Sequence, residues 1–233
     1  DLIDEMTMQR LRMVDVLRDK YKIADERVLE VMGKLPRHLF VPEAIKSQAY
    51  RDNALPIAGG QTISQPYIVA LMTAALELRP EDRVLEVGTG SGYAAAVLAE
   101  IAKEVYTVER HKILAVSARR RLEQLGYGNT HVLHGDGTLG WPDYAPFDAI
   151  VVAAGGPEVP DTLKQQLAVG GRLVIPVGSS LRTQKLLRVL RISEHEFEEE
   201  DLGSVRFVPL IGAAGWEDET ASVVSAKKSA ATL

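Results

Sequence analysis

Short apolar runs alternate with segments of helical character along the middle of the chain. The runs that predict strands lie at 84–87, 104–109, 130–134, 147–154 and 169–178, and the segments that predict helices lie at 94–102, 113–125 and 161–168. The run at 147–154 is almost continuously apolar, as expected for a central parallel strand covered on both faces. This alternation predicts an α/β fold with a doubly wound, mostly parallel sheet, in which ligands bind at the carboxyl ends of the strands.

The N-terminal part of the chain precedes this alternation. Residues 6–21 and 25–33 predict two helices, and Asp25 is placed to cap the second. A further helix is predicted to begin near Pro66, because proline is well tolerated in a first helical turn. We expect these helices to form a flank or lid on the sheet.

The C-terminal part differs again. The runs 184–192 and 204–211 have no helical period and are separated by the acidic stretch 194–201, which predicts a strand pair at one edge of the sheet. After it the chain contains mainly alanine, serine, threonine, lysine and acids, which indicates a mobile extension or an appended remnant. We therefore divide the chain into an N-terminal flank, a core and a tail, at 1–80, 81–216 and 217–233.

Composition limits the function. A chain of 233 residues with 46% hydrophobic residues can form one α/β domain with extra elements, and its net charge of -5 argues against a large nucleic-acid surface. The absence of cysteine excludes disulfides and thiolate nucleophiles, and the five histidines show no metal-binding spacing, so no metal site is expected. No apolar run approaches the ~20 residues of a membrane span, and the charged start does not resemble a signal peptide. We expect a cytoplasmic protein without membrane partners.

The most informative segment follows the first predicted strand. Glu86 precedes three alternating glycines, Gly88, Gly90 and Gly92, and a helix-forming segment comes next. Such glycines let the backbone approach a ligand closely, and the helix start offers unpaired N–H groups. Tyr93 occupies the position where a dinucleotide-binding G-x-G-x-x-G would have its third glycine, and no Walker phosphate loop occurs. An acid before G-x-G-x-G instead resembles the first motif of S-adenosylmethionine-dependent methyltransferases.

Two later strand ends carry further acids. Glu109 ends the second strand at the distance expected for a ribose-binding carboxylate, and Asp136 follows the third strand, placed to bind an adenine amine. A carboxylate such as Glu86 suits the positively charged sulfur and ammonium of this cofactor. Each acid alone could be a solvated strand end or a helix cap, but three successive acids favour one ligand site. The predicted cofactor-binding residues are Glu86, Gly88, Thr89, Gly90, Gly92, Glu109, Asp136 and Gly137.

Two segments before the first strand narrow the resemblance. Residues 36–42 (PRHLFVP) and 59–72, which contain Thr62, Ile63 and Ser64, closely resemble protein-L-isoaspartate (D-aspartate) O-methyltransferases, and the likeness extends from about residue 6 to residue 216. This resemblance implies a Rossmann-like fold with S-adenosyl-L-methionine as donor and S-adenosyl-L-homocysteine as product. The implied reaction methylates the free α-carboxylate of L-isoaspartyl, and in the wider family D-aspartyl, residues in damaged proteins and peptides. Succinimide formation and repair would follow, and we expect a monomer that binds no nucleic acid.

The resemblance also implies site residues. In the family the Thr-Ile-Ser segment lies over the methyl donor and contacts the substrate carboxylate, and its serine, here Ser64, is assigned to the active site. The substrate peptide lies extended near the last strand. The implied substrate-binding residues are Thr62, Ile63, Val205, Arg206, Phe207 and Val208. The chain departs from the family pattern at Gly155 and Gly156, where alanine or proline is expected, and we expect no effect of this departure on the chemistry.

The expected acceptor needs no general base. An α-carboxyl group has a pKa of about 3.3–3.7 and is ionised at neutral pH, so catalysis requires alignment and the exclusion of water. Ser64 would then orient the acceptor and not attack. Two other classes stay open: a methyltransferase for nucleic acid or a small metabolite, although no [DN]-P-P-[YF] motif occurs, and a non-catalytic S-adenosylmethionine-binding sensor or scaffold.

Overall fold

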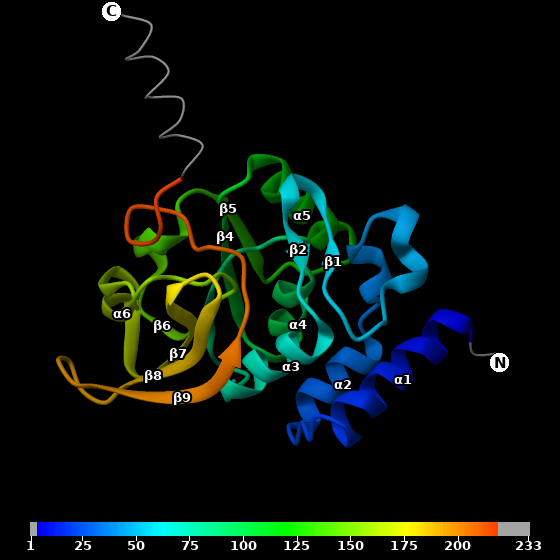
Figure 1. The fold of residues 1–233 in the computed structure, drawn as a ribbon, viewed down its shortest axis with the longest axis horizontal. Helices are drawn as coiled ribbons and strands as arrows, with labels where there is room; N and C mark the ends of the chain where they lie inside the picture. Colours follow the sequence, from blue (N-terminus) through cyan, green and yellow to red (C-terminus); the bar gives the residue numbers. More distant parts are fainter. Residues whose placement is uncertain (1–3, 219–233) are drawn as a thin grey trace, which may run out of the picture.

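The structure, a computed structural model, describes residues 4–218 (Figure 1). Within them seven strands form one sheet in the order β5-β4-β3-β6-β7-β8-β9. The parallel strands are β3 (Arg83–Val87), β4 (Glu104–Glu109), β5 (Thr130–His134), β6 (Phe147–Val152) and β7 (Leu167–Ser180). β3 pairs with both β4 and β6, so the order of the strands reverses beside it. This topology confirms the predicted doubly wound, mostly parallel sheet, and it creates a switch point for ligand binding at the end of β3.

Helices cover both faces of the sheet. The crossovers contain α4 (Tyr93–Ile101), α5 (Lys112–Gln124) and α6 (Asp161–Gln166), close to the predicted segments. Successive side chains of a strand point to opposite faces. Val84 of β3 therefore packs in the core formed with the N-terminal helices and α4, whereas Leu85 packs in the core that contains Leu163 of α6.

The N-terminal flank shares the first of these cores with the sheet. It contains α1 (Glu5–Asp19), α2 (Glu26–Lys34) and α3 (Pro66–Ala75), with 3-10 turns at Arg37–Phe40 and Glu43–Gln48. Asp25 caps α2 by accepting hydrogen bonds from the N–H groups of Arg27 and Val28, and Pro66 lies in the first turn of α3, as predicted. A small hairpin of β1 (Leu55–Pro56) and β2 (Thr62–Ile63), joined through the turn Ala58–Gly60, was not predicted.

The antiparallel edge of the sheet corrects one prediction. β8 (Thr183–Arg191) pairs with β9 (Phe197–Val205), so the edge pair is confirmed but its second strand is not 204–211. The acidic stretch lies largely inside β9, where Glu200 and Asp201 form ion pairs with Arg188 and Lys185 of β8 at 2.5 and 3.0 Å. An edge strand tolerates such charges because solvent reaches them. The chain leaves the sheet after Val205, where β9 ends.

None of the helices within 4–218 combines the length and apolar character needed to cross a membrane. The predicted tail lies outside the described residues from position 219 onward. At its start, Asp218 forms an ion pair with Arg110, which follows the end of β4.

Candidate active site

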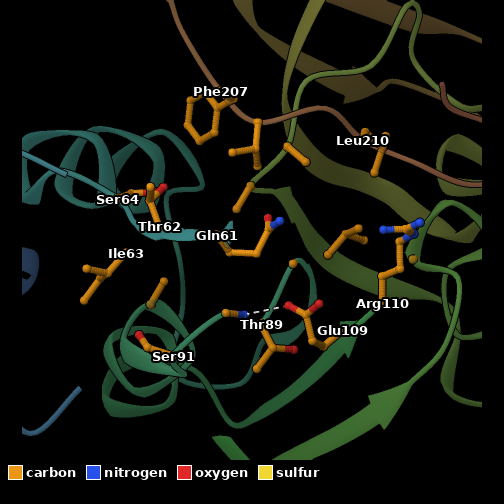
Figure 2. A pocket seen from close by; sticks show the side chains of 18 of the residues that line it. Gln61, Thr62, Ile63, Ser64, Thr89, Ser91, Glu109, Arg110, Phe207 and Leu210 are labelled. Carbon is orange, nitrogen blue, oxygen red and sulfur yellow. Dashed lines mark hydrogen bonds between the residues drawn. The ribbon is translucent and has the colours of Figure 1, made fainter. Parts of the chain in front are cut away.

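A cavity of about 500 Å³ opens at the carboxyl ends of β3 and β4, beside the switch point (Figure 2). One wall is the glycine loop after β3, together with residues 108–111. A second is the chain from the hairpin to α3, and a third is the extended segment 206–211. In the view of Figure 2, Ser64 and Phe207 lie toward one end of the cavity and Glu109 and Arg110 toward the other. One space thus joins three segments that are far apart in the sequence.

Most of the predicted site residues line this cavity. They are Thr62, Ile63, Ser64, Gly88, Thr89, Gly90, Glu109, Gly137, Arg206, Phe207 and Val208. Four predicted residues do not: Glu86, Gly92, Asp136 and Val205. Gly92 is the N-cap of α4, and Val205 is the last residue of β9. Both positions are adjacent in sequence to residues that line the cavity.

Glu109 is fixed in the cavity wall by backbone groups. One carboxylate oxygen accepts a hydrogen bond from the Gly90 N–H at 2.9 Å, and the other accepts one from the His111 N–H at 2.8 Å. The residue is only 5% exposed, yet it lines the cavity. A carboxylate has about four acceptor positions, so lone pairs remain for two hydroxyl donors. The arrangement fits a ribose.

Gly137 lies in a closely packed part of the cavity lining. A Cβ atom at this position would lie 2.4 Å from Cγ1 of Val87, and both residues line the cavity. A side chain at position 137 would therefore displace Val87, another residue of the cavity lining. The glycine keeps this wall flat, which suits a planar ring.

Glu86 is connected to the cavity only indirectly. Its side chain is fully buried and accepts a hydrogen bond of 2.6 Å from the Thr107 hydroxyl, which lies 2.6 Å from the hydroxyl of Thr89. Burial raises the pKa of Glu86 to about 8; the Thr107 hydrogen bond opposes this rise and the charge of Glu109 adds to it. Thr89, at the end of this chain of hydroxyls, lines the cavity. The geometry does not support the predicted direct contact between Glu86 and the cofactor, because the side chain points across the sheet to β4.

Asp136 is also occupied elsewhere. Its Oδ1 accepts hydrogen bonds from the N–H and the hydroxyl of Thr138 at 2.9 and 2.7 Å, and its Oδ2 accepts one from the Ala213 N–H at 2.9 Å. The carboxylate thus caps the turn Gly137–Leu139 and holds the C-terminal segment beside it. This geometry does not support the predicted contact with an adenine amine, although the adjacent Gly137 does line the cavity.

Arg37 supports the segment that contains Ser64. The guanidinium is fully buried; it donates to the Ser64 carbonyl at 2.9 Å and to the Ala49 carbonyl at 2.7 Å. It also lies 4.9 Å from the centre of the Tyr93 ring, at the start of α4. Burial lowers the pKa of Arg37. Arg37 lies in the segment 36–42 that resembles the family, but the residue pattern alone predicts no role for it.

Other wall residues were missed as well. Arg110 and His111 line the cavity directly after Glu109, and Gln61 lines it within the hairpin segment. Arg110 and His111 could have been predicted, because they come immediately after a predicted strand end. Gln184, which contacts the third wall from behind, gave no signal at all.

Known proteins resemble this chain over most of its length. A family model described as protein-L-isoaspartate(D-aspartate) O-methyltransferase (PCMT) matches residues 8–215. Protein-L-isoaspartate O-methyltransferase 1 of Geotalea uraniireducens (strain Rf4) is 64% identical over 194 residues, which cover 83% of this chain and 89% of the relative. The protein-L-isoaspartate O-methyltransferase of Syntrophus aciditrophicus (strain SB) is 54% identical over 217 residues, 92% of this chain and 99% of the relative.

Solved structures agree with these relatives. One protein-L-isoaspartate O-methyltransferase matches with a TM-score of 0.80 at 31% identity, covering 88% of this chain and 67% of that chain. A Plasmodium falciparum protein named as a beta-aspartate methyltransferase (PCMT), solved in complex with S-adenosyl-L-homocysteine, matches with a TM-score of 0.76 at 26% identity. That match covers 87% of this chain and 98% of the other. Both matches extend over nearly the whole described chain.

Proposed function

The chain belongs to the protein-L-isoaspartate(D-aspartate) O-methyltransferase family, and we propose that it methylates the free α-carboxylate of L-isoaspartyl residues in damaged proteins and peptides. The methyl donor is S-adenosyl-L-methionine, and the S-adenosyl-L-homocysteine complex of the Plasmodium relative supports this cofactor. The observation that carries the proposal is the shared cavity, since the glycine loop and Glu109 line it together with Ser64 and residues 206–208. A donor and an acceptor could therefore meet in one cavity.

The cofactor end of the cavity has the groups that this donor requires. S-adenosylmethionine supplies an electrophilic methyl group on a positively charged sulfur. We assign Glu109 to the ribose hydroxyls, because its carboxylate is held by two backbone N–H groups and retains free lone pairs. Gly88 and Gly90 allow the backbone to approach the ligand, and Gly137 leaves a flat surface for the adenine ring.

The acceptor end works by positioning. The α-carboxylate that an isoaspartyl linkage frees is already ionised at neutral pH, so no residue has to remove a proton. Ser64 donates a hydrogen bond that orients the carboxylate, and Arg37 holds the backbone of Ser64 in place. The hairpin and residues 206–208 exclude water from the nucleophile, which strengthens its attack along the line to the methyl group.

The product explains a role in repair. Methylation converts a poor leaving group into an ester, and the neighbouring main-chain nitrogen then attacks the ester carbonyl and releases methanol. The resulting succinimide opens without the enzyme, partly to ordinary aspartate. The enzyme's own contribution ends with the ester.

A labelling experiment tests this function. The protein is incubated with methyl-labelled S-adenosylmethionine and one synthetic peptide in its isoaspartyl, aspartyl and D-aspartyl forms, beside a panel of nucleic acids. We expect base-labile label in the isoaspartyl peptide and none in the aspartyl form. The D-aspartyl form shows whether the enzyme also accepts D-aspartyl residues. Label in nucleic acid, or no label in any peptide while the donor binds, would overturn the proposal.

Three further parts of the proposal rest on the sequence. We propose that the enzyme binds no nucleic acid, which its net charge of -5 supports. We also propose that it is a monomer and that it acts in the cytoplasm. Light scattering at micromolar concentration tests the proposed monomer, and the mass of a dimer would refute it. Fractionation of the source cells tests the proposed location in the cytoplasm.

A further inference from the structure

One buried side chain contacts the third wall of the cavity at Phe207. Gln184, the second residue of β8, is 3% exposed and reaches Phe207 with both ends of its amide. Its Oε1 accepts a hydrogen bond from the Phe207 N–H at 2.7 Å, and its Nε2 donates to the Phe207 carbonyl at 3.4 Å. The amide therefore gives Phe207 the pair of hydrogen bonds that a neighbouring strand would otherwise provide.

This anchor is needed because the wall is not part of the sheet. β9 ends at Val205, and Arg206, Phe207 and Val208 then line the cavity. On the far side of Phe207, the Val208 carbonyl accepts a hydrogen bond from the Gly155 N–H at 2.8 Å, and the Leu210 N–H donates to the Gly155 carbonyl at 2.9 Å. Gln184 and Gly155 thus hold the wall at adjacent points.

Gly155 leaves the space that the glutamine occupies. A Cβ atom at position 155 would lie 2.0 Å from Nε2 of Gln184, so any side chain there would have to displace the amide. The family resemblance predicts alanine or proline at this position and at Gly156. Gly155 and Gln184 therefore fit together behind the third wall of the cavity, and whether this departure from the family pattern affects the chemistry stays a prediction.

We propose that Gln184 is a positioning residue for the peptide substrate, which it serves by fixing Phe207 in the wall of the cavity. This inference rests on the proposed function, because it assigns the segment 206–208 to substrate binding. It predicts a specific defect: loss of the amide should weaken binding of the peptide, whereas the cofactor end, built on β3 and β4, should not change. A general loss of folding would affect both.

Steady-state kinetics with the isoaspartyl peptide test the proposal on Gln184→Met, which keeps the length of the side chain but removes both hydrogen bonds. We expect the KM for the peptide to rise about tenfold, in line with the loss of these hydrogen bonds. The kcat and the calorimetric affinity for S-adenosyl-L-homocysteine should stay within about twofold of wild type, as for a site not in contact. Gln124→Met, on an exposed position of α5, is the matched control and should behave as wild type.

Two more variants keep the test decisive if Gln184→Met does not fold. Gln184→Glu retains an acceptor for the Phe207 N–H but places a second oxygen against the Phe207 carbonyl, and Gly155→Ala displaces the amide without changing it. Both should raise the KM. An unchanged KM in a folded Gln184 variant, or a parallel loss of S-adenosyl-L-homocysteine binding, would overturn the proposal. Failure of the wild-type protein to methylate the peptide would instead refute the proposed function itself.

Discussion

The two ends of the cavity are built in different ways. The cofactor end lies on adjacent parallel strands, where the Gly88 N–H donates to the Val108 carbonyl at 2.9 Å and the Gly90 N–H donates to Glu109. The acceptor end consists of a hairpin and an extended segment that pack outside the main sheet, held by Arg37 and Gln184. The first inherits its geometry from the sheet, whereas the second depends on the buried side chains of Arg37 and Gln184 together with backbone hydrogen bonds to Gly155. Substitutions at the acceptor end should therefore impair methyl transfer without impairing cofactor binding.

The largest effect is expected for Ser64→Ala at the acceptor end. Loss of a group that positions the reacting carboxylate should lower kcat ~10²-fold. The affinity for S-adenosyl-L-homocysteine should stay at the wild-type value, because Ser64 lies outside the sheet-built end. Single-turnover kinetics and calorimetry measure the two effects. Ser117→Ala, at a half-buried position of α5 that does not line the cavity, is the control, and an unchanged kcat in Ser64→Ala would remove Ser64 from the site.

Glu109→Ala should show the opposite pattern. The substitution removes the proposed ribose acceptor and leaves the N–H groups of Gly90 and His111 without their carboxylate. Because hydrogen bonds to a charged group contribute about 1.5–3 kcal/mol, the Kd for S-adenosyl-L-homocysteine should rise more than tenfold. Turnover at saturating donor should be reduced much less. Wild-type affinity by calorimetry would refute the assignment of Glu109.

Arg37→Met tests whether the acceptor end depends on its buried support. Two backbone carbonyls, of Ala49 and Ser64, would lose their donor, and each unsatisfied group costs about 1–3 kcal/mol of stability. We expect a lower melting temperature and about tenfold slower turnover in the folded fraction, with donor affinity retained. Arg37→Lys, which keeps the charge but not the planar fork, should be intermediate. Full turnover in folded Arg37→Met would show that Ser64 does not need this support.

The smallest effect on turnover is expected for Glu86→Gln, whose signature is a change in the pH dependence of stability. Burial raises the pKa of Glu86 from 4.5 to about 8 in the folded state, so the stability that the protonated form contributes is present below pH 4.5 and is lost as the pH rises toward 8. Wild type should therefore lose ~2 kcal/mol more than Glu86→Gln between pH 6 and 8. Denaturant unfolding measures this difference. The exposed Glu123→Gln is the control, and parallel pH profiles would contradict the buried, protonated state.

The same contrast explains what could be predicted from the sequence. The cofactor end follows from one contiguous motif and from strand ends, since parallel strands bring Gly90 and Glu109 together. The directions in which the side chains of Glu86 and Asp136 point could not be predicted, because each depends on a partner from another segment, Thr107 and Ala213.

The roles of Arg37 and Gln184 at the acceptor end could not be predicted from the sequence for a related reason. Arg37 and Ser64 are 27 residues apart, and Gln184 and Phe207 are 23 residues apart, so no local pattern links either pair. The sequence predicts that the acidic stretch 194–201 separates two strands, whereas most of it lies inside β9, because a high density of charge is typical of loops as well as of edge strands. The resemblance to the family indicated the segments of the acceptor end but not what holds them.

The most direct test of this two-part construction is a calorimetric titration of S-adenosyl-L-homocysteine into the double variant Ser64→Ala/Gln184→Met. If the cofactor end is built by the sheet alone, the Kd should lie within about twofold of the wild-type value although methyl transfer to the isoaspartyl peptide is almost abolished. A Kd that rises by tenfold or more in a folded double variant would show that the two ends form one unit, and would contradict the account.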